Sequence, residues 1–400
     1  MLRFWITVAV LVSHFGAHLT IYNRINSLGW PRRYVKRLSK TMLLFCLIAP
    51  LAYFRLADRD DGGIRPAIVV YGAVVVTIAI PHAVLWLLSR PGIERHELTP
   101  PTRTVVDDVS ADHNLTLPRT RRCRTMAMVP GNQMFELSVD RIDLPVDGLP
   151  EGLDGYRIAH LSDVHFTGHV DPSFTARAVE HAMRFEPDLM ALTGDVIDHP
   201  IGWQWIASAF GPASATDGCY FILGNHDLRV SDPNQTRQRM SDIGWIDAAS
   251  DIHRVNLSGR QTDPRPSAMI IGDERPWFDS PSAHRWENET SNIHNDNGHR
   301  PMVIALCHTP DRFQWARRHG VTLMLAGHTH GGQGRLPLAG PILSPSRHGS
   351  RYAGGTFSAS PTTMHVNRGL SGTHLLRIRC RPQVSLLTLR CRPPGEHEST

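Results

Sequence analysis

The chain has 400 residues, of which 41% are hydrophobic and 20% are charged, and its formal net charge is +5. These values suit one large globular domain with additional segments, and they exclude a disordered or fibrous protein. The pI near 9 could indicate a nucleic-acid partner. Much of the basic excess, however, lies in residues 23–40 and 119–124, where anionic lipid is the simpler partner. We therefore do not expect nucleic acid to bind.

The first quarter of the chain contains three apolar segments. Residues 4–22 and 66–88 carry no charge and are long enough to cross ~30 Å of hydrocarbon as helices. Residues 41–54 are also apolar, but this segment is shorter and contains Pro50. It is either a third span or a re-entrant hairpin, and we favour a span. Residues 1–88 are thus predicted to form a transmembrane region of two or three helices, with the lipid bilayer as a partner.

The segments around these helices bear on their orientation. A cleaved signal peptide is an alternative interpretation for residues 4–22, because Arg3 precedes an apolar core. The lack of a small-x-small cleavage motif and the further apolar segments favour a retained helix. The loop at 23–40 contains Lys and Arg but no Asp or Glu, which predicts that it is cytoplasmic. With three spans, the protein is a multi-pass membrane protein whose residues after 88 are cytoplasmic; with two spans, they lie outside.

Some side chains in this part admit more than one interpretation. His14 and His18 are one helical turn apart in the first apolar segment, which could indicate a metal or haem pair. We favour two histidines that face a neighbouring helix. The six cysteines of the chain form no CxxC motif or regular framework, which is typical of a reducing compartment.

The remainder of the chain is predicted to hold one catalytic domain. Residues 89–130 are rich in Pro, Arg, Thr and Asp without apolar periodicity, so we expect a basic linker. Residues 131–392 alternate strand and helix patterns, which predicts an α/β domain with a parallel-rich sheet. Residues 279–300 are polar and are expected to form a loop or small cap, and 393–400 a disordered tail. A helix is expected from Asp171 to about 185, and the expected strands are 134–142, 156–161, 189–193, 268–271, 302–306, 322–325, 364–366, 374–379 and 384–389.

Five short motifs follow apolar runs that indicate buried strands. They contain Asp, Asn and His, and in chain order they are Asp163-Val164-His165, Gly194-Asp195, Gly224-Asn225-His226-Asp227, Cys307-His308 and Gly327-His328-Thr329-His330. Each motif alone is more often structural, but the tetrapeptides GNHD and GHTH in this order arise by chance about once in ten thousand sequences or less. The series resembles that of the calcineurin-like metallophosphoesterases. The resemblance covers residues 131–389 and implies two facing mixed β-sheets flanked by helices.

The resemblance also implies a centre with two divalent metal ions, for which the mixed imidazole and oxygen ligands favour Mn, Fe or Zn. The implied ligands of the first ion are Asp163, His165, Asp195 and His330. The implied ligands of the second ion are Asp195, Asn225, His308 and His328, so that Asp195 bridges the two. By the same resemblance His226 stabilises the transition state or protonates the leaving oxygen. Its orienting carboxylate is predicted to be Asp198, with Asp227 as the weaker candidate.

Residues within and beyond the five motifs indicate which branch of the family the sequence resembles. The segment after Asp195 lacks Arg-Gly, and GNHD replaces GNHE, which argues against a Ser/Thr protein phosphatase. Residues 308–311, 331–333 and 366–370 resemble the membrane-anchored bacterial metallophosphoesterases, such as a phosphodiesterase acting on UDP-diacylglucosamine. This resemblance implies a metal-dependent phosphoester hydrolase, a phosphodiesterase or phosphatase with a lipid- or nucleotide-linked substrate. The alternatives are a tethered enzyme for a soluble substrate, a membrane scaffold that has lost activity, and a lipid or haem carrier. The sequence leaves the oligomeric state open.

Overall fold

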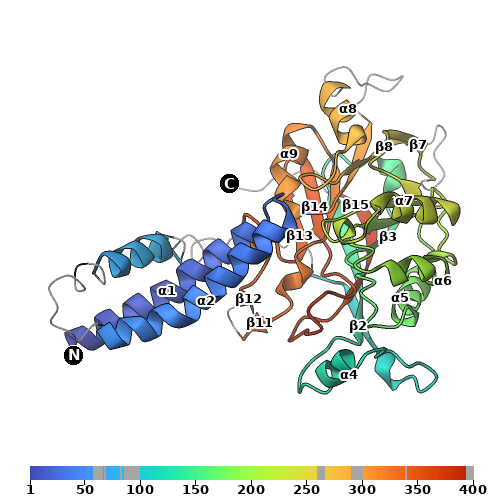
Figure 1. Ribbon diagram of the computed structural model, residues 1–400. Helices are drawn as coiled ribbons and strands as arrows, with labels where there is room; N and C mark the ends of the chain where they lie inside the picture. Colours follow the sequence, from blue (N-terminus) through green and yellow to red (C-terminus); the bar gives the residue numbers. More distant parts are fainter. Residues whose placement is uncertain are drawn as a thin grey trace. The chain divides into compact units, whose positions relative to one another are not determined.

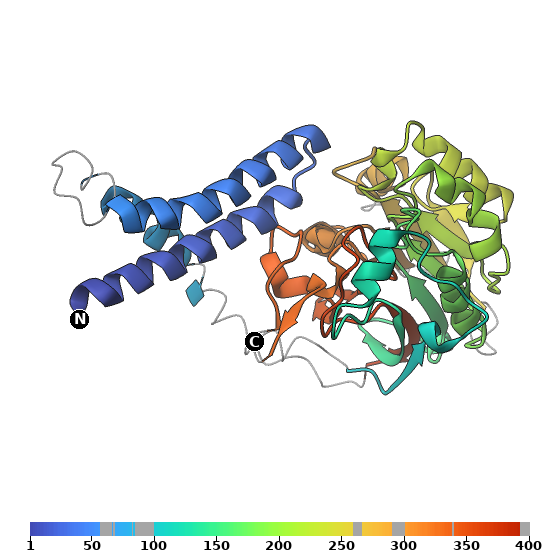
Figure 2. The same cartoon turned by 60° about the horizontal axis from the view of Figure 1, so that its bottom comes forward.

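The structure is a computed structural model that describes residues 1–56, 66, 69–81, 83–84, 100–258, 266–289, 301–337 and 340–392. The chain forms two compact units. The first, the helical unit, comprises residues 1–95 and 342–351, and the second, the catalytic unit, comprises residues 96–341 and 352–400. Figures 1 and 2 show both units from two directions.

The helical unit is built on two long helices, α1 (Leu2–Asn26) and α2 (Arg32–Leu56), which lie side by side (Figures 1 and 2). A shorter apolar helix spans Val69–Pro81. Within the described residues, one helix, Trp5–Asn26, is long and apolar enough to cross a membrane by length and composition. The apolar segment at 41–54 lies in α2, which continues through Pro50. Residues 67, 68, 82 and 85–88 of the predicted span at 66–88 lie outside the described part of the chain.

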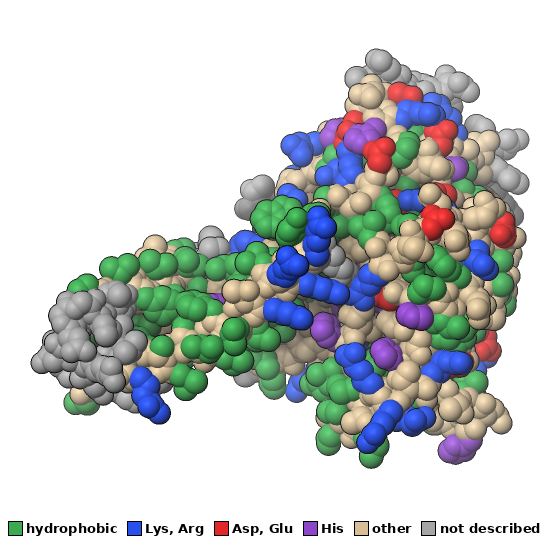
Figure 3. Space-filling view, viewed as in Figure 1, with side chains coloured by type: hydrophobic (Ala, Val, Ile, Leu, Met, Phe, Trp, Pro, Cys, Tyr) green, Lys and Arg blue, Asp and Glu red, His purple; other side chains and the backbone are tan. Residues whose placement is uncertain are grey.

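Large apolar side chains of these helices are exposed, and hydrophobic side chains cover much of the visible face of α1 and α2 in Figure 3. They include Trp5, Val12, Phe15, Leu43, Leu44, Phe45, Leu47, Ile48, Leu51, Val69, Val70, Val74 and Ile80. A continuous exposed apolar surface of this kind marks an interaction with lipid or protein.

A segment distant in sequence belongs to the same unit. Near the end of α1, the Asn23 side chain donates a hydrogen bond to the carbonyl of Ile342 at 3.0 Å. Its amide oxygen accepts one from the backbone N–H of Ser344, also at 3.0 Å. The Asn23 amide therefore attaches the segment 342–351 to the helical unit at the end where the basic loop begins.

The catalytic unit is a sandwich of two mixed β-sheets. Among the described residues, one sheet has seven strands in the order β1 (Arg103–Asp108), β2 (Glu136–Val146), β15 (Gln383–Cys391), β3 (Arg157–Leu161), β4 (Leu189–Thr193), β5 (Cys219–Ile222) and β6 (Ile246–Asp247). The other described sheet has six strands in the order β13 (Gly355–Ala359), β14 (Thr362–Val366), β10 (Leu323–Ala326), β9 (Met302–Cys307), β8 (Ser267–Asp273) and β7 (His253–Asn256). β3 to β6 run parallel, as do β8, β9, β10 and β14. A small ribbon pairs β11 (Arg335–Leu336) with β12 (Gly340–Pro341).

Helices cover the two outer faces of the sandwich (Figure 1). They are α4 (Arg121–Ala127), α5 (Ser173–Met183), α6 (Ile206–Phe210), α7 (Pro233–Asp242), α8 (Pro281–Glu289) and α9 (Phe313–Arg318). Short 3-10 helices form η1 (Val109–Ala111), η2 (Glu151–Leu153), η3 (Pro200–Gln204), η4 (Asp227–Arg229), η5 (Pro310–Arg312), η6 (His330–Gly332) and η7 (Gly349–Tyr352). α5 and α6 pack on the seven-stranded sheet, and α8 and α9 on the six-stranded sheet.

The hydrophobic core of the described residues consists of three clusters, one between the two sheets and one under the helices on each outer face, because the central strands are buried on both faces. Ile158 of β3 and Leu189 of β4 face Ile304 of β9 and Leu323 of β10 between the sheets. The alternate residues of the same strands face the helices instead, in two outer clusters. Strands buried on both sides appear in sequence as continuous apolar runs. The predicted fold class, two facing mixed sheets flanked by helices, is confirmed.

Residues 103–127 differ from the linker that the sequence predicts. β1 pairs antiparallel with β2 from Arg103 opposite Arg141 to Asp108 opposite Glu136. β1 is an edge strand whose side chains are mostly exposed, so its backbone pairing leaves no apolar period in the sequence. The catalytic unit therefore begins before residue 131. Residues 89–99 of the predicted linker lie outside the described part of the chain.

The predicted strand at 374–379 is wrong, and the predicted cap at 279–300 is described only in part. Residues 374–379 form no strand; within them Ile378 makes only isolated bridges, to Asn132 and Gly334. The reason is that Arg377 is buried and donates to nearby loop carbonyls, which holds this stretch as a loop. In the predicted cap, Pro281–Glu289 forms α8, while residues 290–300 and the predicted tail at 393–400 lie outside the described residues.

Candidate metal centre

The motif residues lie directly after the carboxyl ends of five central strands. Asp163 and His165 follow β3, while Asp195 and Asp198 follow β4. The other motif residues follow β5, β9 and β10, and they are Asn225, His226, His308, His328 and His330. In an open α/β sheet this edge is where binding sites form, because the chain turns away from the strand ends there. Both sheets of the sandwich thus contribute to one site.

The backbone at this edge is strained. Five of the predicted ligands are non-glycine residues with positive φ, a region that costs about 1–3 kcal/mol for each such residue. They are Asp163 (φ 52°), His165 (φ 50°), Asp195 (φ 55°), His328 (φ 71°) and His330 (φ 51°). The surrounding structure holds these conformations, which turn the side chains toward one another after each strand.

The first group of side chains contains the four residues predicted to hold the first ion. One potential ligand atom from each of Asp163, His165, Asp195 and His330 lies within 4.8 Å of all the others. The Nε2 atom of His165 is 3.4 Å from Oδ2 of Asp195 and 3.1 Å from Nε2 of His330. Nε2 of His330 is 3.5 Å from Oδ1 of Asp163.

The second group shares Asp195 with the first. Asp195, His308 and His328 form a buried cluster of the same kind. Nε2 of His308 is 3.3 Å from Oδ1 of Asp195 and 3.1 Å from Oδ1 of Asn225. Nδ1 of His328 is 3.2 Å from Nε2 of His308. Asp195 therefore directs Oδ2 to the first group and Oδ1 to the second, as a bridging carboxylate does.

Two buried atoms indicate that this arrangement fits metal ions. Among the described residues, Oδ2 of Asp195 and Nε2 of His328 are buried without a hydrogen-bond partner. Buried polar atoms are nearly always paired, so an unpaired one needs an explanation such as an ion. Ring nitrogens that face each other at 3.1 and 3.2 Å are consistent with imidazoles that converge on a common cation. Imidazole with carboxylate and amide oxygens suits divalent transition metals.

The electrostatics of the site are consistent with the same conclusion. Burial disfavours ionised carboxylates, yet His330 and His165 hold the pKa of Asp163 well below its usual range. Burial also acts against ionisation of Asp195, but the neighbouring histidines, chiefly His308, hold the pKa of this carboxyl far below normal. Burial lowers the pKa of His308, but the Asp195 carboxylate outweighs it and raises that pKa to about 9. Burial, together with His308, lowers the pKa of His328 to about 3. Two buried carboxylates kept ionised require nearby positive charge.

The predicted pair of His226 and Asp198 lies at the side of the first group. Nδ1 of His226 donates to Oδ1 of Asp198 at 2.6 Å, and Nδ1 of His165 donates to Oδ2 at 2.6 Å. The same carboxylate forms an ion pair with Arg229. Asp198 thus orients both a predicted ligand and the predicted acid, and it fixes which ring nitrogen of each carries the proton.

Asp227, the weaker candidate for that role, has other partners. Its carboxylate accepts hydrogen bonds from the backbone N–H groups of Gly224 and Ile197, both at 2.8 Å, and of Val196 at 3.3 Å. It joins the loops after β4 and β5 rather than orienting His226. The structure therefore favours Asp198.

The glycines before these residues are required by close packing. Gly194 has φ of 88°, and a Cβ atom there would lie 2.6 Å from Nδ1 of His308. At Gly224, a Cβ atom would lie 2.6 Å from Cε1 of His308. A larger residue at either position would displace the imidazole, which explains why the motifs contain glycine.

Three residues near the site were not identified from the sequence. Arg229 lies beside His226, with Nη2 3.4 Å from Nε2 of His226. The Trp277 ring lies 4.8 Å from the His328 ring and 5.4 Å from the His308 ring, centroid to centroid. Buried Arg377 donates to the carbonyls of His330 and Ser371. The position of Arg229 just after GNHD was an available signal, whereas the other two lie far from any motif.

An α/β sandwich of this form, with an intact set of His and Asp residues at its strand ends, defines a metal-dependent phosphoesterase. Residues 156–332 match the family described as calcineurin-like phosphoesterase. This part of the chain is thus similar to the calcineurin-like metallophosphoesterase superfamily, whose members typically hold two metal ions. The resemblance predicted from the motifs is confirmed at this level.

Individual relatives are distant. The chain is 29% identical to the metallophosphoesterase YkuE of Bacillus subtilis over 246 residues, which cover 60% of this chain and 82% of that protein. It is 26% identical to the phosphodiesterase YaeI of Escherichia coli over 237 residues, or 58% of this chain and 82% of that protein. It is 22% identical to the UDP-2,3-diacylglucosamine pyrophosphatase LpxG of Chlamydia muridarum over 298 residues, which cover 64% of this chain and 89% of that protein.

Proposed function

We propose that the protein is a membrane-anchored phosphodiesterase or phosphatase that uses two divalent metal ions of the Mn, Fe or Zn type. The observation that carries this proposal is the position of Asp195, whose two carboxylate oxygens point to two separate groups of His, Asp and Asn ligands. Bound there, two such ions lower the pKa of a water and neutralise charge on the phosphoryl oxygens.

The other roles belong to the protein's own side chains. One ion would be held by Asp163, His165 and His330 together with Asp195. The other would be held by Asn225, His308 and His328, again together with Asp195. Asp198 keeps His226 oriented through its Nδ1, so that Nε2 serves the leaving oxygen as proton donor. Arg229 adds positive charge beside His226, which favours the binding of an anionic phosphoester.

The substrate proposal rests on the helical unit and on two relatives. One relative is named as a phosphodiesterase and another as a pyrophosphatase of UDP-2,3-diacylglucosamine. The exposed apolar side chains of α1 and α2 suit insertion into a bilayer. We therefore favour a lipid- or nucleotide-linked phosphoester over a soluble substrate handled by a tethered enzyme.

The proposal includes a multi-pass anchor and a cytoplasmic catalytic unit; within the described residues one helix, Trp5–Asn26, has the length and composition of a span. The loop at 23–40 supports this proposal, because it contains Lys and Arg but no Asp or Glu, and the positive-inside rule makes such a loop cytoplasmic.

An activity comparison on the purified full-length protein in detergent tests the enzyme proposal. With Mn²⁺ present, we expect hydrolysis of bis-p-nitrophenyl phosphate, and the ratio to p-nitrophenyl phosphate separates a phosphodiesterase from a phosphatase. Asp242→Asn, which changes an exposed carboxylate at the end of α7, should retain this activity, whereas Asp195→Asn should lose it. Failure of the wild type to cleave either ester with Mn²⁺, Fe²⁺ or Zn²⁺ would contradict the proposal.

A further inference from the structure

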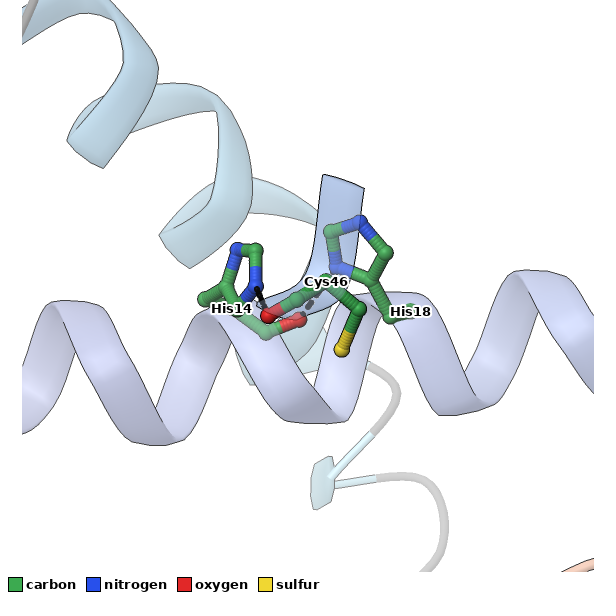
Figure 4. A group of neighbouring side chains, drawn as sticks. All are labelled: His14, His18 and Cys46. Carbon is green, nitrogen blue, oxygen red and sulfur yellow. Dashed lines mark hydrogen bonds between the residues drawn. The ribbon is translucent and has the colours of Figure 1, made fainter. Parts of the chain in front are cut away.

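A second group of metal-binding side chains lies in the helical unit. His14 and His18 of α1 and Cys46 of α2 lie next to one another (Figure 4). One ligand atom from each lies within 4.8 Å of the others. We propose that these three residues bind one metal ion of the zinc class, at a site separate from the centre at the strand ends.

The positions of the two histidines suit a shared ion. They are four residues apart in α1, so their side chains project from the same face of the helix, and their ring centroids are 4.2 Å apart. Ligands of a tetrahedral zinc ion lie at about 2.0–2.3 Å from the metal, and so roughly 3.5 Å from each other. Small side-chain rotations would bring the three atoms from within 4.8 Å to that spacing.

The hydrogen bonds of both rings leave a nitrogen suited to metal binding. Nε2 of His14 lies 3.0 Å from the carbonyl oxygen of Cys46, and Nδ1 of His18 lies 2.8 Å from the carbonyl oxygen of His14. A carbonyl only accepts, so these two nitrogens carry the protons. Nδ1 of His14 and Nε2 of His18 then carry the lone pairs. Metal-bound histidines usually donate their second N–H to a carbonyl or carboxylate in this way.

Tyr71, on the helix Val69–Pro81, provides an oxygen at the same place. Its hydroxyl contacts Nδ1 of His14, and its ring lies 5.9 Å from the His14 ring, centroid to centroid. A metal ion at Nδ1 of His14 would replace this contact, and the displaced hydroxyl can then supply a fourth, oxygen ligand. Three helices of the unit would then be joined at one ion.

The competing explanation is that the histidines only join helices by hydrogen bonds. That explanation accounts for the two carbonyl contacts, but it gives no role to the Cys46 thiol. Among the described residues the thiol forms no disulfide and has no hydrogen-bond partner. A thiolate beside two imidazoles favours zinc over calcium or magnesium. On binding, the thiol proton is released to solvent and the sulfur lone pair forms the bond to the metal.

Cobalt spectroscopy on the full-length protein in detergent tests the proposal. Co²⁺ replaces Zn²⁺ in tetrahedral sites, and a thiolate ligand then produces a charge-transfer band in the near ultraviolet. The clusters at the strand ends contain no cysteine, so the band reports on the site in the helices. Because the centre at the strand ends is proposed to take two ions, we expect the band in the wild type once three equivalents of Co²⁺ have been added. Asp195→Asn and Cys391→Ser, which alter the catalytic unit only, should retain it.

Cys46→Ser and His18→Gln should each lose the band, with helix content by circular dichroism unchanged. Absence of the band in the wild type, or its persistence in Cys46→Ser, would overturn the proposal. A second measurement uses the unaltered chain, so that folding of a variant is not at issue. Three equivalents of Zn²⁺, one more than the strand-end centre is proposed to take, should slow alkylation of Cys46 by about 10-fold or more, as followed by peptide mass spectrometry. Equal rates with and without this Zn²⁺ would contradict zinc binding.

Discussion

Asp195 and His226 are neighbours, since the backbone N–H of His226 donates to Oδ1 of Asp195 at 2.7 Å, but their loss should have different effects. Asp195→Asn removes the shared carboxylate, and we expect it to lower both metal content and turnover. His226→Ala should leave both ions bound and reduce kcat by about 100-fold or more, because it removes only the proton donor. Metal analysis of the purified variants together with kcat separates the two outcomes. Equal metal loss in both would show that the roles are wrongly assigned.

The residues of the site differ in how far sequence could identify them. Those in the five motifs could be predicted, because each follows a strand and stands beside other residues of the same chemistry. The structure brings all of them together. Arg229 could have been identified from its position two residues after GNHD. Trp277 and Arg377 acquire their positions only through tertiary packing, because a single Trp or Arg in a loop has no pattern that separates it from an ordinary residue.

At the level of elements, a buried ion pair joins α7 to the loop after β8. Glu274 is fully buried, and its carboxylate binds Arg237 of α7 and accepts from the backbone N–H of Leu223. Glu274→Ala leaves the Arg237 charge without this partner, and we expect it to lower the free energy of unfolding by about 3–5 kcal/mol. Urea unfolding measures the change.

The matched control for that variant is Glu289→Ala, because Glu289 lies on the surface 3.9 Å from Arg254. Such an exposed pair should contribute about 0–1 kcal/mol. Replacement of both Arg237 and Glu274 by leucine should recover part of the loss, since the buried Glu274 carboxylate and the Arg237 charge are then both absent and only the partly exposed Asp247 loses a partner. Equal effects of Glu274→Ala and Glu289→Ala would show that the buried pair does not stabilise the fold.

A second prediction concerns β1, the strand that sequence did not reveal. Asp107 accepts hydrogen bonds from Arg177 at 2.9 Å and His181 at 2.7 Å, both on α5. Partial burial acts against ionisation, but His181 and Arg177 lower the pKa of Asp107 below its ordinary 3.8. Because the folded-state pKa is depressed, the stabilisation is present above pH 3.8 and is lost as the pH falls through the lower, folded-state value.

Asp107→Asn should therefore lower the free energy of unfolding by about 1 kcal/mol at pH 7, and the difference from wild type should vanish in acid below pH 3.8. Urea titrations of both proteins across this range provide the measurement. A difference that is constant down to the lowest pH would show that the carboxylate charge is not involved.

The central strands of the fold were predictable because burial on both faces produces continuous apolar runs. β3, β4, β9 and β10 are all of this kind. β1 and the loop at 374–379 were not predictable in the same way. An edge strand with exposed side chains has no apolar period, and a buried Arg377 that binds backbone carbonyls is not visible as a pattern.

For the whole molecule, membrane topology can be tested directly. A reporter enzyme fused after Arg95 should be active on the cytoplasmic side, because the loop at 23–40 is basic and free of acids. A signal from an extracytoplasmic reporter at this position would contradict it and place the catalytic unit outside the cell.

Substrate access should depend on the helices if the substrate is a lipid. The full-length protein in mixed micelles should cleave a lipid phosphoester at least about 10-fold faster than a fragment that starts at His96, because anchoring raises the local concentration of substrate. A fragment that starts at residue 131 would be unsuitable, since it lacks β1 and α4. Both proteins should cleave bis-p-nitrophenyl phosphate equally. Equal rates on the lipid would favour the soluble-substrate alternative.

The metal centre draws its residues from both sheets of the sandwich, with Asp163 and Asp195 on one side and His308 and His328 on the other. Neither sheet alone can assemble it, so a chain acquires its ions only after the two sheets have met. Until then, two carboxylates and several strained residues have nothing to hold them in place. Ions that bind only the assembled centre would stabilise the packed sheets against unfolding, so their removal by a chelator should lower the unfolding temperature.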